Sequence, residues 1–190
     1  MPSRTKTLGM QHPLAPLSAL VLVLVLTGCA SQARTAAGNG GAPDDRVADA
    51  KICESIRARL LARDPGSRSV LSVLCNSQLV VIAGALPPDY KLAVEAVHIA
   101  TKTPGVRRVE TFFVPRAAPD PGDSDIAARI KAALAGDTSA RTEGTDLTVV
   151  AGTVVLVGMV DDQAKADRLV ERAGSVTGVK SVKSFIQLKP

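Results

Sequence analysis

Aromatic residues are nearly missing from this 190-residue chain, which has no tryptophan, one tyrosine and three phenylalanines. Single-stranded nucleic acids bind largely by stacking their bases on aromatic rings, and so few rings provide no platform for stacking. Histidine is also scarce, since His12 lies near the N-terminus and His98 is the other one. We therefore expect no nucleic-acid partner and little capacity for general acid–base catalysis.

Motifs for catalysis or metal binding are missing as well. No histidine, cysteine and carboxylate cluster has ligand spacing, so we predict no metal site and no cofactor. His98 falls opposite the apolar stripe of its predicted helix, which favours a solvent-facing residue over a catalytic one. The pair Asp161-Asp162 suggests a carboxylate dyad or cation site, but it precedes a predicted helix, and we expect it to serve in capping and dipole compensation instead. A small hydrolase that depends on His98 is the enzyme alternative.

The N-terminus has the pattern of an export signal. Arg4 and Lys6 precede an apolar run from Leu14 to Leu26, which is shorter than the roughly 20 residues of a membrane-spanning helix. Leu26-Thr-Gly-Cys29 resembles the lipobox of bacterial lipoproteins, which implies cleavage before Cys29 and lipidation of that cysteine; an ordinary cleaved signal peptide is the alternative. Under the sorting rule that this resemblance brings with it, Ala30 implies the outer membrane, facing the periplasm.

Export would reduce the positive charge. The whole chain carries 23 basic and 18 acidic residues, and removing residues 1–28 deletes two basic residues, which leaves 21 minus 18, or +3. Such a charge suits contact with anionic lipid head groups, and it is equally an ordinary solubility charge. Residues 30–43 are rich in alanine, glycine, serine and asparagine, which indicates a flexible tether.

The rest of the chain contains one pattern twice. Apolar residues at four-residue spacing predict a helix over roughly residues 46–62, and two strands, a second helix and a third strand follow. At a shift of 74, and of 73 after the first proline pair, the two copies align. The matched pairs include Ile52 with Ile126, Ile56 with Ile130, Leu60 with Leu134, Val73 with Leu147, Gly84 with Gly158, Gly105 with Gly178 and Phe112 with Phe185.

These copies predict an α+β protein with two tandem αββαβ domains. Each domain is a small mixed three-stranded sheet covered by two helices. The predicted parts are a lipoprotein signal peptide (1–28), lipidated cysteine and tether (29–45), first domain (46–115), proline-rich linker (116–122) and second domain (123–190). Asp89 is placed to cap the second helix of the first copy, as Asp161 or Asp162 is in the second.

Glycines at fixed places identify the repeat with a known domain. Val154-Val-Leu-Val-Gly158-Met-Val160 precedes the second helix, and Gly178-Val-Lys-Ser-Val182 follows it; the first copy keeps Gly84 and Gly105-Val-Arg-Arg-Val109. This pattern resembles the BON domain, and two copies behind a lipobox resemble dual-BON-domain outer-membrane lipoproteins. The resemblance implies a non-enzymatic protein of envelope integrity and stress resistance.

The same resemblance implies a partner and a contact surface. Proteins of this kind bind anionic phospholipid, and the contact would fall on the first helix of the second domain, at Arg129 and Lys131. The alternative is a scaffold or assembly factor that binds outer-membrane or periplasmic proteins or peptidoglycan, with lipidation of Cys29 serving only as an address.

Three differences between the copies leave alternatives open. Cys53 and Cys75 replace Ala127 and Val149, which suggests either a disulfide in an oxidising compartment or two free thiols. Apolar residues replace two basic ones on the second helix, either for a wider core or for contact with the other domain: Leu92 for Lys165 and Ile99 for Arg172. The first helix of the first copy is basic, which suggests a solvated face or a lipid-binding face: Arg57, Arg59 and Arg63.

Overall fold

The computed structural model describes residues 43–115, 122–136 and 144–189. The predicted signal peptide, Cys29, and most of the predicted tether and linker lie outside the described residues. Residues 37–190 form one compact unit, which contains every described element and apolar cluster. A fragment that begins at Ala30 therefore retains the whole described fold. Among the described helices, none combines the length and the apolar character needed to cross a bilayer.

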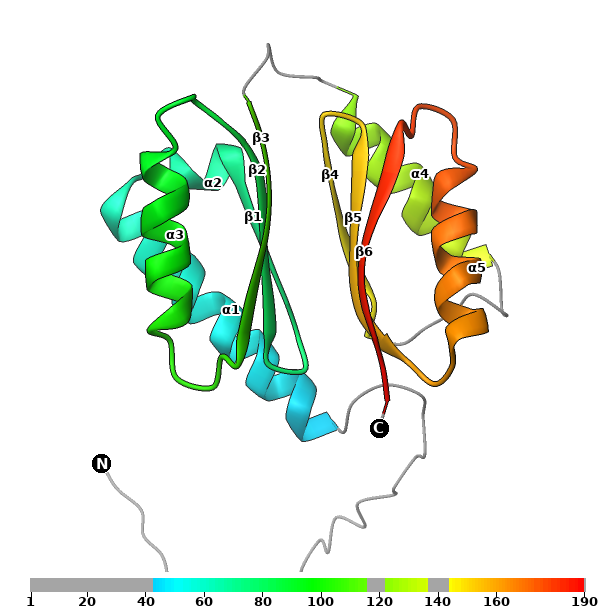
Figure 1. Cartoon of the computed structure of the whole chain (residues 1–190), viewed down its shortest axis with the longest axis horizontal. Helices are drawn as coiled ribbons and strands as arrows, with labels where there is room; N and C mark the ends of the chain where they lie inside the picture. Colours follow the sequence, from blue (N-terminus) through cyan, green and yellow to red (C-terminus); the bar gives the residue numbers. More distant parts are fainter. Residues whose placement is uncertain (1–42, 116–121, 137–143, 190) are drawn as a thin grey trace, which may run out of the picture. The chain divides into compact units, whose positions relative to one another are not determined.

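The first repeat contains three helices and three strands (Figure 1). They are α1 (Pro43–Arg63), α2 (Ser67–Val70), β1 (Leu71–Asn76), β2 (Leu79–Leu86), α3 (Lys91–Thr101) and β3 (Arg108–Pro115). The strand order is β1-β2-β3, with β1 antiparallel and β3 parallel to β2. The predicted αββαβ order is confirmed, and α2 is an additional single turn that the sequence did not predict.

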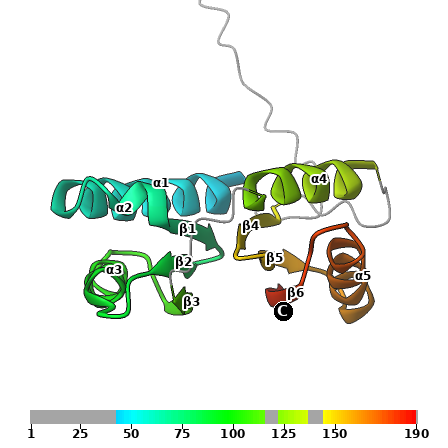
Figure 2. The ribbon, with the colours of Figure 1, turned by 90° about the horizontal axis from the view of Figure 1, so that it is seen from above.

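The second repeat has the same order without the short helix. Its elements are α4 (Asp123–Gly136), β4 (Asp146–Val150), β5 (Thr153–Val160), α5 (Gln163–Gly174) and β6 (Ser181–Leu188). The sheet order β4-β5-β6 again joins an antiparallel to a parallel pair. Seen from above, the long helices of each repeat lie on one side of their own sheet: α1 and α3 in the first repeat, α4 and α5 in the second (Figure 2). The predicted mixed three-stranded sheets are therefore confirmed.

The central strands are apolar on both faces, which explains their uninterrupted apolar sequences. Along β2 the side chains alternate: Val80 and Ile82 pack with the helices, whereas Leu79 and Val81 enter a different cluster. Strand β5 alternates in the same way, and all four of these β2 side chains are at most 2% exposed. A strand buried on both faces needs apolar residues at every position, as the sequence provides.

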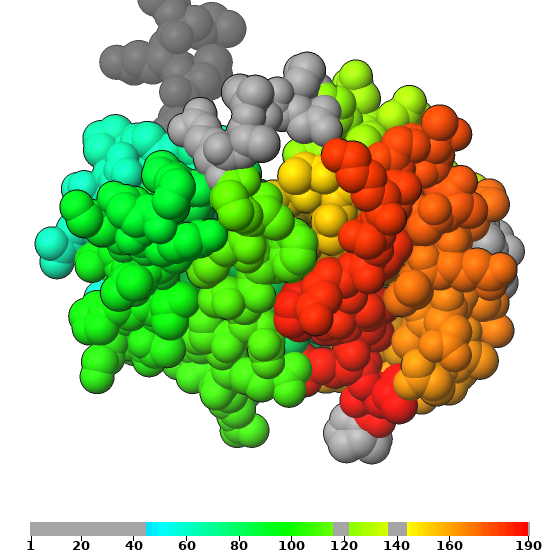
Figure 3. Space-filling model, turned by 45° about the horizontal axis from the view of Figure 1, so that its top comes forward, coloured from blue at the N-terminus to red at the C-terminus, as the bar shows by residue number. Residues whose placement is uncertain are grey.

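The faces of the sheets that carry no helix share one apolar cluster. It joins β1 and β2 to β4 and β5 within the compact unit, through Leu74, Leu79, Val81, Ala83, Val150, Val155 and Val157. Two polar contacts accompany it: the Ser72 and Thr148 hydroxyls lie 3.0 Å apart, and the Asn76 amide donates to the Gly144 carbonyl at 2.6 Å. Strands β3 and β6, at the other edges of the sheets, reach the surface on the face shown in Figure 3.

A carboxylate from the first helix holds the tight turn between the first two strands in each repeat. Asp49, which is 7% exposed, accepts hydrogen bonds from the backbone amides of Ser77 and Gln78 at 2.6 and 3.0 Å. Asp123 does the same for Ala151 and Gly152 at 2.7 and 2.8 Å. All four turn residues have positive φ, as a type I′ turn requires. The carboxylates therefore offset the strain of side chains in a conformation that favours glycine.

The glycine in the middle of each central strand allows a close approach of backbone. A Cβ added to Gly84 would stand 2.1 Å from the carbonyl oxygen of Val70, which no side chain can tolerate. At the equivalent Gly158, the added atom would stand 3.2 Å from the Cα of Thr145. These glycines are therefore explained by packing rather than by ligand binding.

Two expectations about the second helix of the first repeat are settled. The predicted cap at Asp89 is wrong: Tyr90 takes the N-cap position with a positive φ of 48°, and no side chain caps α3. Asp89 instead lies 3.8 Å from the Lys91 ammonium at the surface. The extra apolar residues widen the core, because Ile99 is buried and Leu92 packs against the same cluster.

We predict that Asp49→Ala lowers the free energy of unfolding by about 1–3 kcal/mol, because two buried amide donors lose their acceptor. Denaturant unfolding of the fragment beginning at Ala30 measures it. The exposed Glu171 on α5 gives the control, and Glu171→Ala should change the value by less than about 0.5 kcal/mol. Equal stabilities of Asp49→Ala and wild type would show that the carboxylate does not hold the turn.

Candidate functional site

The two cations predicted to contact lipid do not form one cluster. Arg129 and Lys131 both lie exposed on α4, but two residues along a helix they point to nearly opposite sides. The Arg129 guanidinium lies by the turn after α5, where its Nη2 would be 3.4 Å from a Cβ added to Gly178. Lys131 has no hydrogen-bond or ion-pair partner among the described residues. The two side chains therefore do not converge on one point, and their contact with lipid stays a prediction.

The basic residues of α1 are held by the fold. Arg57 Nη2 donates to the Val73 carbonyl at 2.5 Å, and Arg59 Nη1 donates to the Thr103 hydroxyl at 3.2 Å. Arg63 lies 3.5 Å from the Glu95 carboxylate. A simple solvated face is therefore an incomplete interpretation, because each arginine connects α1 to a strand or to the α3 region.

A groove lies beside Arg57, between α1, α2, β1 and the strand β4 of the second repeat. Its volume is about 470 Å³, within the range of small-molecule sites. Apolar side chains form much of its wall, including Ala58, Leu61, Leu71 and Leu147. Arg57, Arg68 and Glu54 also line it, so two cations and one carboxylate meet an apolar surface.

Hydroxyl groups add hydrogen-bond donors to this α1–β1 groove. Ser67 is only 3% exposed, and it lines the groove. Ser72 and Thr148 line the groove as well, and they contact each other. The groove therefore combines several donors with an apolar wall.

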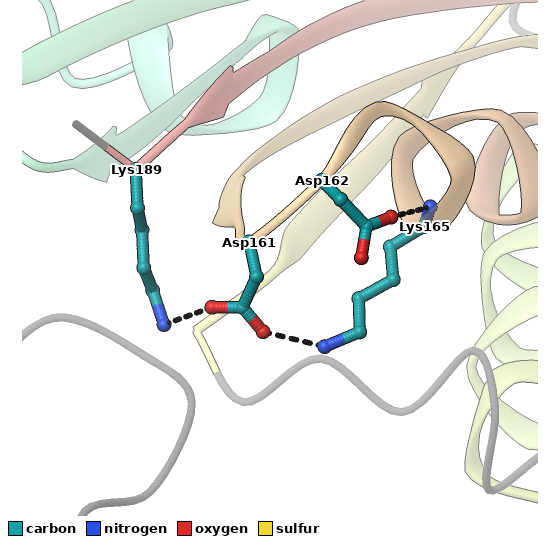
Figure 4. A network of polar contacts seen from close by, with 4 residues as sticks. All are labelled: Asp161, Asp162, Lys165 and Lys189. Carbon is teal, nitrogen blue, oxygen red and sulfur yellow. Dashed lines mark hydrogen bonds and ion pairs between the residues drawn. The ribbon is translucent and has the colours of Figure 1, made fainter.

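The acidic pair between β5 and α5 is a structural joint (Figure 4). Asp162 caps α5, since its carboxylate accepts from the Lys165 backbone amide at 2.7 Å. Asp161 accepts from the ammonium groups of Lys165 and Lys189. The hydrogen bond from Lys165, followed by that from Lys189, lowers the pKa of Asp161 and keeps it ionised. Capping by Asp162 is confirmed, and both carboxylates have structural partners.

Other groups with catalytic potential are dispersed. His98 is exposed on α3, as predicted, and Tyr90 is half-buried at the start of that helix. Within the described part of the chain, no three histidine, cysteine or carboxylate side chains gather closely enough to hold a metal ion.

Comparison with known proteins identifies the repeat. The BON domain family matches residues 122–190, which is the second repeat. Osmotically-inducible protein Y of Escherichia coli (strain K12) is 31% identical over 147 residues, covering 74% of this chain and 73% of that protein. The chain belongs to the BON-domain family. Because both repeats have the same order, register and glycine contacts, the first repeat of this BON-domain protein is a second copy of the matched fold.

Solved structures give a more distant likeness. Two structures of CdsD, a structural protein of the type III secretion system of Chlamydia trachomatis, are 18% and 17% identical, with TM-scores of 0.32 and 0.31. They cover 70% and 75% of this chain, and this chain spans 64% of each of them. Scores this low support no conclusion about function.

Cys53 and Cys75 lie at one end of the groove-forming elements. In the structure a disulfide joins them, with a Cα–Cα distance of 5.8 Å that is typical of such bonds. Cys53 is buried on α1 and Cys75 is half-buried on β1. A disulfide would therefore fix the first helix of this repeat against its edge strand. Whether the pair is oxidised in the exported protein stays a prediction.

The groove was not predictable from sequence patterns. In the sequence Arg57 is distinguished only as part of a basic helix, and Ser67 and Arg68 lie in a short segment without a periodic pattern. The available signal was a difference between copies, because Leu61 stands where the second repeat has Ala135.

We predict that the exported protein contains the Cys53–Cys75 disulfide and that replacing both cysteines by serine lowers stability by about 3 kcal/mol. Mass spectrometry without reduction checks the bond, and denaturant unfolding checks the stability. Val149→Ala, at the position equivalent to Cys75, is the control for packing loss alone. Two free thiols in the exported protein would contradict the prediction.

Proposed function

We propose that this BON-domain protein is a non-enzymatic binding module of the bacterial envelope. Lipidated Cys29 would anchor it to the outer membrane, facing the periplasm. There it supports envelope integrity under stress by binding anionic phospholipid or another envelope component. Several acyl chains on Cys29 would make the anchoring long-lived, because each buried CH₂ contributes about 0.8 kcal/mol.

The observation that carries this proposal is an exposed cation without a carboxylate partner on a BON-domain scaffold. Arg68 is exposed and has no ion-pair partner among the described residues. A cation that faces an anionic membrane contributes about 1 kcal/mol. A related protein that is named for osmotic induction agrees with a role in envelope stress.

One observation favours a protein or peptidoglycan partner instead. A second groove, of about 610 Å³, lies between the end of α1 and the start of α3. Both signs of charge line it, including Arg63, Lys91, Asp89 and Glu95. Mixed charge suits a polar partner better than a lipid. Cross-linking in cells would favour the scaffold function if one protein dominated the products and Arg129 and Lys131 proved dispensable.

We predict that the fragment beginning at Ala30 floats with vesicles that contain phosphatidylglycerol and floats less with vesicles of neutral phosphatidylcholine. The difference should shrink at high salt, because salt screens the attraction between exposed cations and the membrane. Density-gradient flotation at low and high salt measures both effects. Equal binding to neutral and anionic vesicles would remove the lipid part of the proposal.

A further inference from the structure

We propose that the α1–β1 groove of the first repeat is the site that binds the anionic phospholipid. Arg68, Ser67 and Arg57 contact the phosphate of the head group, and the start of one acyl chain lies along Leu61 and Leu71. This inference rests on the proposed function, and it places the contact in the first repeat rather than on the first helix of the second.

The donors of the groove suit a phosphate. Arg68 is exposed and has no partner among the described residues, so its guanidinium can turn toward a ligand. Ser67, a residue that is 3% exposed, adds a hydroxyl to the lining of the groove. Guanidinium groups bind phosphate oxygens through charge-assisted hydrogen bonds, and a hydroxyl adds a neutral donor.

The apolar wall suits a chain attached to that phosphate. Leu61 is 43% exposed, although most large apolar residues of this repeat are buried. Leu61 and Leu71 both line the groove, together with Ala58 of α1. Free phosphate would leave this apolar surface in contact with water, whereas the first methylene groups of an acyl chain would cover it. The combination therefore favours a lipid over an inorganic anion.

Arg57 has a structural role that the test must separate from binding. Its hydrogen bond to the Val73 carbonyl satisfies one acceptor at the outer edge of β1, where an open strand edge would otherwise favour pairing with another strand. Glu54 lines the same groove and reduces its positive charge. Arg68 and Leu61 form no described hydrogen bond or ion pair, so replacing them leaves the fold intact.

The second repeat provides a matched control. At the shift of 74, Lys131 stands at the position of Arg57, and Ala135 stands at the position of Leu61. Both are exposed on α4. A double variant at these positions removes one positive charge, as a double variant of the groove does, but it leaves the groove untouched.

The test is flotation of the fragment beginning at Ala30 with phosphatidylglycerol-containing vesicles, together with its melting temperature. The groove variant Arg68→Gln/Leu61→Ser should bind about tenfold more weakly than wild type, at an unchanged melting temperature. The control Lys131→Gln/Ala135→Ser should stay within about twofold of wild type, because one exposed cation outside the site adds little.

Wild-type affinity in the groove variant would overturn the inference. Loss of binding in the Lys131→Gln/Ala135→Ser control, with the groove variant unaffected, would also overturn it, while the proposed lipid-binding function would stand. Failure of the wild-type fragment to prefer anionic vesicles would overturn both.

Discussion

The structure depends on covering central strands that are apolar on both faces. A three-stranded sheet with two helices on one side leaves its other side open to water. In this protein the open faces of both sheets contribute to one cluster, in which Val81 and Val155 are fully buried. A unit of about seventy residues has a small core of its own, so a shared cluster adds stability that each copy would lack. The second copy therefore covers the sheet face that a single copy would expose to water.

Local features that occur in both repeats stabilise the strands and turns of these sheets. Asp49 and Asp123 hold equivalent turns, and Gly84 and Gly158 allow equivalent close contacts. The aspartates between β5 and α5, Asp161 and Asp162, are therefore a structural joint, even though their sequence suggests a cation site. Features that occur in only one repeat are the better candidates for function. The disulfide and Leu61 belong to the first repeat, which also supplies most of the lining of the α1–β1 groove; β4 adds Leu147 and Thr148.

Much of the fold could be predicted because helices and strands bury residues at characteristic spacings. The stripe of Ile52, Ile56 and Leu60 is a local pattern, and its burial is confirmed. The cap at Asp89 was wrong because the chain turns one residue later, at Tyr90. Contacts between distant residues leave no local pattern. The Asp49 carboxylate reaches amides 28 and 29 residues away, and the groove forms only when α1, α2 and β1 come together.

The ligand should bind where the two copies differ, in the first repeat. Amide chemical-shift mapping of the fragment beginning at Ala30, titrated with dihexanoyl phosphatidylglycerol, locates binding most directly. Binding in the groove predicts the largest shifts at the amides of residues 57–73, with those of α4 nearly unchanged. Shifts concentrated on α4, around Arg129 and Lys131, would contradict a site in the first repeat.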